Sequence, residues 1–153
     1  MKILVSGGAG FVGTNLIKKL LKEGYEVTSL DNYSTGFKEN HQKGCHYIEY
    51  DISSPHTHGI YVDHNTYPSW RDEEYDIIYH MAALARIQPS LENPHQTILN
   101  NFYSTLNLID FARKNNTPFV YAGSSSKHHG LWGSPYAWSK FGGEQLCELY
   151  SKV

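Results

Sequence analysis

The sequence predicts an α/β fold with a doubly wound parallel sheet of about five strands, in one domain over residues 1–153. Two observations predict it. Short apolar runs rich in Val, Ile, Tyr and Phe recur along the chain, and amphipathic stretches separate several of them. A glycine-rich turn also follows the first apolar run directly, as in a βαβ unit. A chain of this length buries about 68–70% of its unfolded surface, which is enough for one core.

A dinucleotide-binding turn is predicted at the N-terminus. An apolar strand at residues 3–5 leads into the glycine-rich turn, and a helix is expected over about 11–23. Gly7 can adopt backbone angles that a Cβ would forbid, Gly10 lets the main chain approach a diphosphate, and Gly13 lets the helix pack closely. The amide groups at the start of this helix would then face the diphosphate.

The second predicted strand, residues 25–30, ends at Asp31. A carboxylate there can accept hydrogen bonds from a ribose diol and would repel a 2′-phosphate, so NAD is favoured over NADP. The glycine spacing is G-x-x-G-x-x-G rather than G-x-G-x-x-G, and a glycine-rich turn without a ligand is the alternative. The sequence contains no G-x-x-x-x-G-K-[ST], which excludes a P-loop.

The first helix is expected to cover the sheet with an apolar face that includes Phe11, Ile17, Leu20 and Leu21. A short helix at most is expected over residues 37–43. The third strand, 46–50, is followed by Asp51 and Ile52, which could accept from an adenine amine and contact its ring. A strand that simply ends in aspartate is the alternative.

Residues 53–74 contain two prolines and no helical period, so we expect an extended, loop-rich crossover in place of a helix. Four side chains of this segment could hold a metal in principle, but they lack a recognisable ligand spacing. They are His56, His58, Asp63 and His64. We therefore favour a solvated polar loop and predict no metal.

The fourth strand is predicted at residues 75–79, and the small residues Ala82 and Ala83 after it would let its end approach a cofactor. Ordinary packing against the first helix is the alternative. A long helix is expected over about 94–114. Its apolar residues exceed a single stripe, so one face can cover the sheet while the excess needs another partner.

The fifth strand, residues 118–122, leads to a polar turn at Ser124. This turn lies at the carboxyl edge of the predicted sheet, where ligands bind in open parallel sheets. The last helix is expected over 135–151, with Ser134 as N-cap and Pro135 at its first position.

Tyr136 and Lys140 lie four residues apart, so they project from one face of this helix. Together with Ser124 they form a candidate acid–base unit. A neighbouring ammonium favours a phenolate, and a serine hydroxyl can align a substrate oxygen. A chance match to Y-x-x-x-K is the alternative, but the glycine turn and the serine turn in the same chain favour a shared design.

The composition of the chain limits which partners and cellular settings are expected. The formal net charge is −2, with 13 basic and 15 acidic residues and no basic run, so nucleic acid is not an expected partner. Two cysteines, Cys45 and Cys147, lie far apart, which suits free thiols in a reducing compartment. No signal segment opens the chain and no apolar stretch approaches about 18 residues, so we expect a soluble cytoplasmic protein without a membrane partner.

These motifs together resemble the N-terminal part of the extended short-chain dehydrogenases/reductases, the NAD-dependent nucleotide-sugar epimerase/dehydratase family, and most closely its UDP-glucose 4-epimerase-like members. The resemblance implies a Rossmann-type sheet in the order 3-2-1-4-5. The residues that carry it are Gly7 to Gly13, Leu30 to Asn32, Asp51 and Ile52, His80 to Ala83, residues 101–108, Ser124 and Tyr136 to Lys140.

The resemblance also implies roles for these residues. It implies Ser124, Tyr136 and Lys140 as the catalytic set, with Tyr136 removing a sugar hydroxyl proton while NAD takes the hydride. The implied NAD-binding residues are Gly7, Gly10, Phe11, Val12, Gly13, Asp31, Asn32, Asp51, Ile52, Ala82, Ala83, Asn101, Tyr136 and Lys140. Of these, Asn101 matches the family's structural asparagine on the long helix, and Lys140 is implied to hold the nicotinamide ribose.

The implied substrate is a nucleotide-sugar, a UDP-sugar first of all, and the implied assembly is a homodimer through the helices at 94–114 and 135–151. The turn after Ser124 lacks the carboxylates of family dehydratases, which favours epimerase or simple oxidoreductase chemistry. The segment between Ser124 and Tyr136 is shorter than is usual in the family, and the family's C-terminal substrate domain is absent from these 153 residues. A non-catalytic NAD-binding module that lost its substrate-binding half is therefore the alternative.

Overall fold

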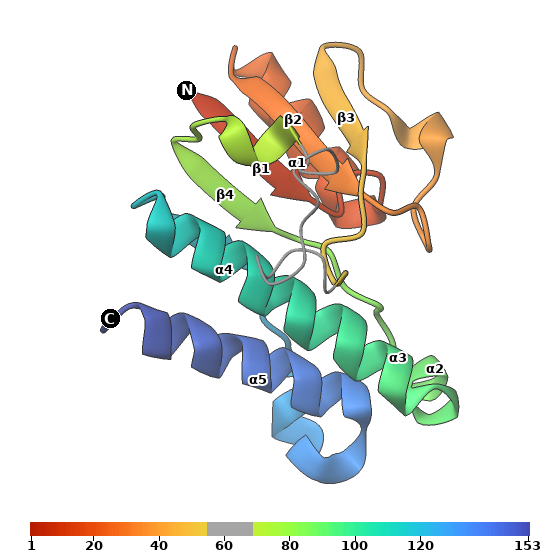
Figure 1. Ribbon diagram of the computed structural model, residues 1–153. Coiled ribbons are helices and arrows are strands. Elements are labelled where there is room, and N and C mark those ends of the chain that lie inside the picture. Colours follow the sequence, from red (N-terminus) through yellow and green to blue (C-terminus); the bar gives the residue numbers. More distant parts are fainter. Residues whose placement is uncertain (55–68) are drawn as a thin grey trace.

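The computed structural model describes residues 1–54 and 69–153. Its five strands form one parallel sheet in the order β3-β2-β1-β4-β5, which confirms the predicted topology. Helix α1 lies behind the sheet, while α4 lies on its other side with α5 alongside (Figure 1). The strands are β1 (Lys2–Ser6), β2 (Glu26–Asp31), β3 (Cys45–Glu49), β4 (Ile77–His80) and β5 (Phe119–Tyr121).

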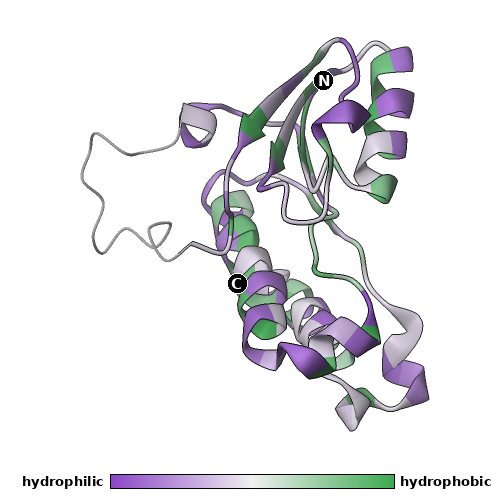
Figure 2. Ribbon diagram, turned by 90° about the vertical axis from the view of Figure 1, so that its right-hand side faces the viewer, coloured by the Kyte–Doolittle hydropathy of each residue, from purple (hydrophilic) through white to green (hydrophobic). Residues whose placement is uncertain are grey.

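The central strands β1 and β2 are buried along nearly their whole length, because successive side chains point to opposite sides of a sheet that is covered on both faces. Ile3 and Val5 of β1 pack with Ile17 and Leu20 of α1 (Phe11–Lys22). Leu4 points the other way, toward the core beneath α4. Hydrophobic residues alternate with polar ones in the strands, whereas hydrophilic residues gather on the outer side of α1 (Figure 2).

One expectation for α1 was wrong. Phe11 is 85% exposed and takes no part in covering the sheet, because it is the first residue of the helix and stands at the mouth of the glycine turn. The helix ends as expected, with Gly24 at a φ of +82° directly after its C-cap residue Glu23.

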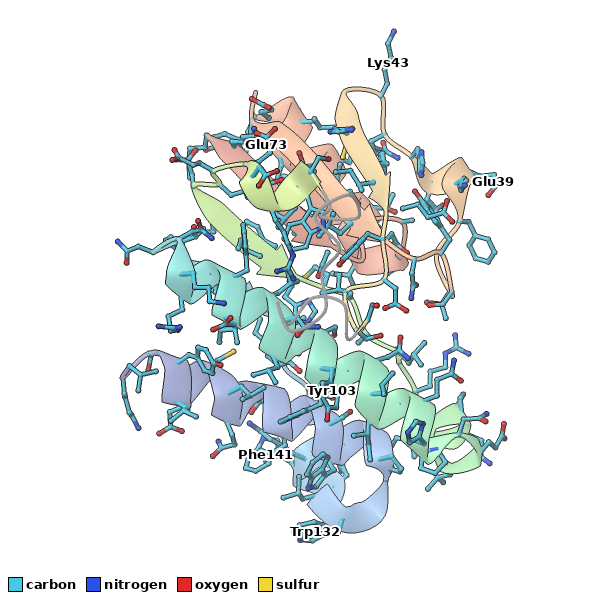
Figure 3. All side chains as sticks on the ribbon, in the orientation of Figure 1. Glu39, Lys43, Glu73, Tyr103, Trp132 and Phe141 are labelled. Atoms are coloured by element: carbon cyan, nitrogen blue, oxygen red, sulfur yellow. The ribbon has the colours of Figure 1, made fainter. Side chains whose placement is uncertain are left out.

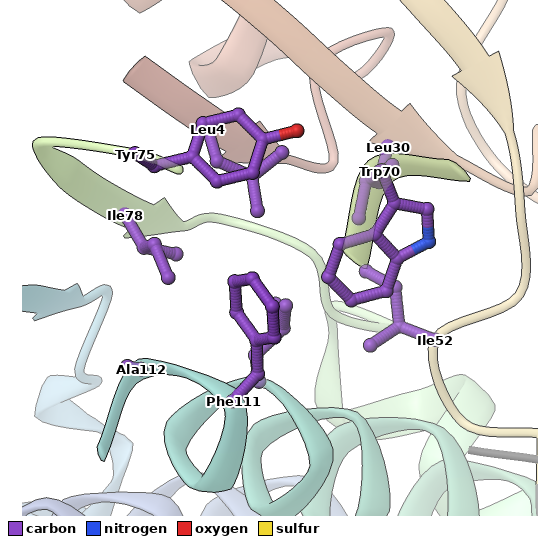
Figure 4. Packing of buried hydrophobic residues seen from close by; sticks show 9 residues of the cluster. Leu4, Leu30, Ile52, Trp70, Tyr75, Ile78, Phe111 and Ala112 are labelled. Atoms are coloured by element: carbon purple, nitrogen blue, oxygen red, sulfur yellow. The ribbon is translucent and has the colours of Figure 1, made fainter. Parts of the chain in front are cut away.

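The core under α4 (Ser104–Lys114) is built around aromatic residues. Trp70 is 1% exposed, and its ring meets that of Phe111 edge-on at 5.1 Å between centroids. Tyr75 approaches Phe111 in the same way at 6.4 Å, and Figure 4 shows the three rings together with Leu4, Leu30, Ile52 and Ile78. Trp70 belongs to the segment expected to be an extended loop, so the described end of that crossover supplies a core residue.

The helix expected over 94–114 is interrupted. It consists of α3 (Pro94–Ile98), one π-helical turn (Leu99–Tyr103) and α4. A short helix that was not expected, α2 (Ile87–Glu92), precedes it. The π turn adds a residue to the helical repeat, so apolar residues before and after it fall on different faces. Part of the surplus apolar surface is thereby turned toward α5, where Phe102 contacts Trp138 at 5.9 Å between ring centroids.

The last helix, α5 (Pro135–Tyr150), begins as predicted. The Ser134 hydroxyl accepts the amide hydrogen of Ala137 at 3.1 Å, and Pro135 is the first helical residue. Strand β5 is one of the two edges of the sheet, and Val120 in its centre is 40% exposed. Among the helices of residues 1–54 and 69–153, none has the length and apolar character needed to cross a bilayer.

Candidate functional site

The turn after β1 requires glycine at different positions for two different physical reasons. Gly7 has a φ of +72°, and a Cβ there would lie 2.6 Å from the Ala82 amide nitrogen. A Cβ on Gly13 would collide with the carbonyl oxygen of Gly7. Both positions are therefore fixed by contacts inside the protein, since the turn is packed against the end of β4 and the start of α1.

Gly10 is different. A Cβ at this position would meet only the Gly7 carbonyl oxygen, at an ordinary contact distance of 3.4 Å, and its φ of −81° suits any residue. The space that its missing side chain leaves open belongs to the cavity outside the turn. Gly10 is also the N-cap of α1 and offers no side chain to cap the first amides, so these donors face the same space.

Two adjoining cavities lie over this turn and share Gly7, Gly10 and Ala83 in their walls. The smaller, of about 90 Å³, extends toward Asp31 and Asp51. The larger, of about 650 Å³, extends over Phe11 and Val12 toward α2 and α3 and also has Gly13 in its wall. The first cavity has acidic side chains at its end, and the second is lined by amides, hydroxyl groups and Arg86.

Asp31 closes the acidic end. It is 8% exposed, and its two carboxylate oxygens accept amide hydrogens from Ala9 at 2.9 Å and Tyr33 at 2.8 Å. The side chain therefore holds the glycine turn and the loop after β2 in place. Each carboxylate oxygen has a second lone pair, which leaves acceptor capacity for a ribose hydroxyl.

Three other predicted residues meet at the same end. Asn32 lines the smaller cavity beside Asp31, and its side-chain oxygen accepts the amide hydrogen of Ser34 at 3.0 Å. Asp51 is exposed and accepts from both the amide and the hydroxyl of Ser53. Ile52 lines the cavity while its side chain belongs to the core. The three residues form one wall of a site suited to an apolar ring with polar edges.

Ala82 and Ala83 follow the end of β4, and both line the smaller cavity. Ala82 is also the residue against which Gly7 packs. Both alanines thus border the cavity, and Ala82 also packs against the glycine turn, while approach of a cofactor to them stays a prediction.

Asn101 does not line either cavity but fixes a residue that lines both. It is 1% exposed in the π turn, accepts the amide hydrogen of Leu84 at 2.7 Å and donates to the Leu84 carbonyl at 3.1 Å. Its amide also donates to the hydroxyl of Ser139 on α5 at 3.1 Å. Asn101 therefore joins the cavity wall to the helix that carries Tyr136 and Lys140.

His80 is a residue of this region to which sequence reasoning gave no role of its own. It is fully buried at the end of β4, with Nδ1 2.5 Å from Ser6 Oγ and Nε2 3.0 Å from Thr105 Oγ1. Burial, and secondarily the Lys140 charge, lower the pKa of His80 to about 3. Its position directly before the small residues that follow β4 was the available signal, because a polar side chain at a buried strand end needs partners.

Ser124 follows β5, and Tyr136 and Lys140 lie on α5. The Ser124 hydroxyl accepts the amide hydrogen of Ser126 at 3.2 Å and lies 2.8 Å from the Ser126 hydroxyl. Tyr136 and Lys140 occupy successive turns of one face of α5. Lys140 is 4% exposed, with Nζ 4.2 Å from the centroid of the Tyr121 ring.

Burial lowers the pKa of Lys140 to about 8, partly offset by the negative charge of Glu144. An ammonium in this position can change its protonation state near neutral pH.

Within residues 1–54 and 69–153, no cluster of three His, Cys, Asp or Glu side chains is arranged to hold a metal. The four residues considered as metal ligands in the sequence all lie outside the described ranges.

Comparison with known proteins identifies the family of this chain. The profile of the NAD dependent epimerase/dehydratase family matches residues 3–152. A provisionally named UDP-glucose 4-epimerase of Methanocaldococcus jannaschii is 30% identical over 99% of this chain and 51% of its own length. UDP-glucuronic acid decarboxylase 1 of Danio rerio is 32% identical over 88% of this chain and 29% of its own length.

The fold has counterparts among solved structures. The UDP-glucose 4-epimerase of Thermus thermophilus, crystallised with NAD, superposes with a TM-score of 0.82 at 29% identity, over 99% of this chain and 51% of that one. The chain thus spans about half the length of the epimerases it matches. On the family profile, the sheet order and the glycine turn, this chain belongs to the NAD-dependent epimerase/dehydratase family.

Proposed function

We propose that this chain binds NAD in the two adjoining cavities and takes part in NAD-dependent chemistry on a nucleotide-sugar, a UDP-sugar first of all. The observation that carries the coenzyme proposal is Gly10, whose missing side chain leaves space in a cavity rather than in the protein interior. A diphosphate fits there because amide donors of the first turn of α1 face it. The carboxylate of Asp31 suits an unphosphorylated ribose.

Bound NAD supplies a hydride acceptor. The chain's own residues would do the rest: Tyr136 would accept the proton of a sugar hydroxyl, and Ser124 would donate a hydrogen bond to the same oxygen. Lys140 would hold a ribose hydroxyl and stabilise a Tyr136 phenolate through its charge. Relatives include both an epimerase and a decarboxylase by name; we propose epimerase or simple oxidoreductase chemistry, because the turn after Ser124 continues with Ser125, Ser126 and Lys127 rather than carboxylates.

The experiment is an incubation of the purified chain with NAD⁺ and UDP-glucose, UDP-galactose or UDP-glucuronate. Absorbance at the NADH band reports reduction, and NMR of the sugar reports epimerisation. We expect turnover in wild type and a loss of at least about 100-fold in Tyr136→Phe. Tyr150→Phe, on the last turn of the same helix, is the matched control and should retain activity. NAD binding without turnover of any of these sugars would instead assign a non-catalytic NAD-binding module.

We also propose a homodimer through the helices at 94–114 and 135–151. Tyr103 and Leu149 on these helices are 42% and 54% exposed, and Figure 3 labels Tyr103 at the π turn and Phe141 at α5. Paired helices from two copies would form a four-helix bundle that covers them. Sedimentation equilibrium should give the mass of two chains for wild type and of one chain for Tyr103→Glu.

A reducing, cytoplasmic setting is part of this proposal. Cys45 and Cys147 are free thiols. Burial raises the pKa of Cys45 to about 11 and that of Cys147 above its ordinary value. Both thiols are therefore poorly reactive at neutral pH.

A further inference from the structure

Glu144 lies four residues after Lys140 on α5, and thus on the same face as Tyr136 and Lys140. Its carboxylate extends toward the turn that carries Ser124. One oxygen, Oε1, accepts the amide hydrogen of Ser124 at 3.3 Å. The other, Oε2, forms an ion pair with Nζ of Lys127. The two ends of the turn at residues 124–127 are thereby tied to a single side chain.

This ion pair is more enclosed than the others that join the described residues. The side chains of Lys127 and Glu144 are 30% and 24% exposed, whereas those of Lys152 and Glu148 on the last part of α5 are 65% and 60% exposed. Lys127 also lies 5.9 Å from the centroid of the Phe141 ring. A partly enclosed pair with a backbone hydrogen bond holds geometry better than an exposed pair, which is worth only about 0–1 kcal/mol.

Gly123 gives independent support. A Cβ at this position would lie 2.8 Å from Oε1 of Glu144. Its φ is not positive, so the backbone does not require glycine here. The absence of a side chain at 123 is therefore what allows the carboxylate to reach the Ser124 amide.

Glu144 also acts on Lys140. Burial lowers the pKa of Lys140, and Glu144 is the first of the charges that raise it again. The other titratable groups around this ammonium are Tyr136 and Cys147 on α5, the Tyr121 ring of β5 and His80 of β4, which is held neutral by burial. Cys147 also raises the Lys140 pKa, but less than Glu144 does, so removing the Glu144 charge removes the largest upward contribution.

We propose that Glu144 is a positioning residue, whose carboxylate fixes the turn at residues 124–127 against α5 so that the Ser124 hydroxyl and the Lys140 ammonium are presented to the same ligand. The inference deepens the proposed function and rests on it for the identity of that ligand. Glu144 touches neither substrate nor coenzyme in this role. It acts through Ser124 and Lys140.

The test uses two NMR measurements on the full chain that need no turnover. The first is amide hydrogen exchange at Ser124. We expect exchange about tenfold faster in Glu144→Ala, because a hydrogen bond to a charged acceptor is lost. Gly123→Ala should give the same acceleration with little loss of stability, since its methyl group displaces only the end of a flexible side chain. Glu144→Gln keeps an acceptor oxygen and should retain most of the protection.

The second measurement is the titration of Lys140 through its ¹³Cε shift, which a merely structural role would not move. The Lys140 pKa should fall further in Glu144→Gln, since the charge is gone while the shape is kept. Glu148→Gln, which removes an exposed carboxylate one turn further on, is the matched control and should change neither readout.

If the Glu144 and Gly123 variants match Glu148→Gln in both measurements, the positioning role is overturned. A wild type without turnover that still shows both responses contradicts the proposed function and leaves the positioning role supported.

Discussion

The Ser6 hydroxyl donates its hydrogen to Nδ1 of His80 across 2.5 Å. The direction follows from the neighbours. Ser6 Oγ already accepts the Ala82 amide hydrogen at 3.3 Å, and the Thr105 hydroxyl donates to the Asn101 carbonyl at 2.7 Å. Thr105 Oγ1 must therefore accept from His80, so the ring hydrogen is on Nε2. A neutral histidine of one tautomer thus joins Ser6 of β1 to Thr105 of α4.

This arrangement predicts acid sensitivity. The pKa of His80 is about 3 in the folded chain and about 6.5 when unfolded. Between these values the unfolded state binds the extra proton, so stability is lost as the pH falls below 6.5. The contribution amounts to about 2 kcal/mol between pH 7 and 5. Urea unfolding of His80→Gln should show a pH dependence weaker than that of wild type by this amount. His128→Gln, exposed on the turn after β5, should keep the wild-type dependence.

Substitutions of Gly10 and Gly13 should affect different properties, NAD affinity at Gly10 and stability at Gly13. Gly10→Ala adds a methyl group to the cavity without an internal clash, so its Tm should stay near that of wild type while NAD affinity falls at least about tenfold. Gly13→Ala places a methyl group against the Gly7 carbonyl and should be destabilised by about 1–3 kcal/mol. Thermal melts and calorimetric titration distinguish the two. Equal loss of stability in both variants would refute the distinction.

Asp31 combines a structural and a selective role. Asp31→Asn keeps one acceptor oxygen for two amides, so one buried amide loses its partner, which costs about 1–3 kcal/mol. The change also removes the charge that opposes a 2′-phosphate. We expect the ratio of NADP⁺ to NAD⁺ affinity to rise at least about tenfold. An unchanged ratio, measured by calorimetry with both coenzymes, would show that Asp31 does not face the ribose.

The hydrogen bonds of Asn101 should couple α5 to the cavity wall at Leu84. Asn101→Ala removes both hydrogen bonds to Leu84 and the one to Ser139. Because the partners are largely enclosed, we expect a loss of about 2–4 kcal/mol in unfolding free energy and weaker NAD binding. Ser139→Ala breaks only one of the three bonds and should reproduce a minor part of the effect. Urea unfolding with and without NAD measures both quantities.

Much of the fold could be predicted from the sequence because its signals are local. The glycine turn, the strands that alternate sides of the sheet, and the cap at Ser134 and Pro135 each depend on a few neighbouring residues. The π turn could not be predicted, since one inserted residue leaves the apolar composition of 94–114 unchanged and alters only its phase. Trp70 follows a segment without periodicity, and only tertiary packing reveals it as core.

The residues of the candidate site likewise divide into those that local sequence predicts and those that it does not. Gly7 and Gly10, whose roles depend on backbone geometry, could be predicted from the glycine spacing together with the strand, helix and acidic residue around it. His80 and Glu144 act through side chains that come from distant parts of the chain, such as Ser6 and Thr105 or Ser124 and Lys127. Their spacing carried no signal strong enough to assign a role, although Glu144 does continue the four-residue interval from Tyr136 to Lys140.

The central claim is that the cavity over Gly10 and beside Asp31 receives a dinucleotide. Calorimetric titration of the purified 153-residue chain with NAD⁺ tests it most directly. We predict saturable binding of one NAD⁺ per chain, with weaker binding of NADP⁺. Millimolar NAD⁺ and NADH that produce neither binding heat nor a change in Tm would contradict the claim.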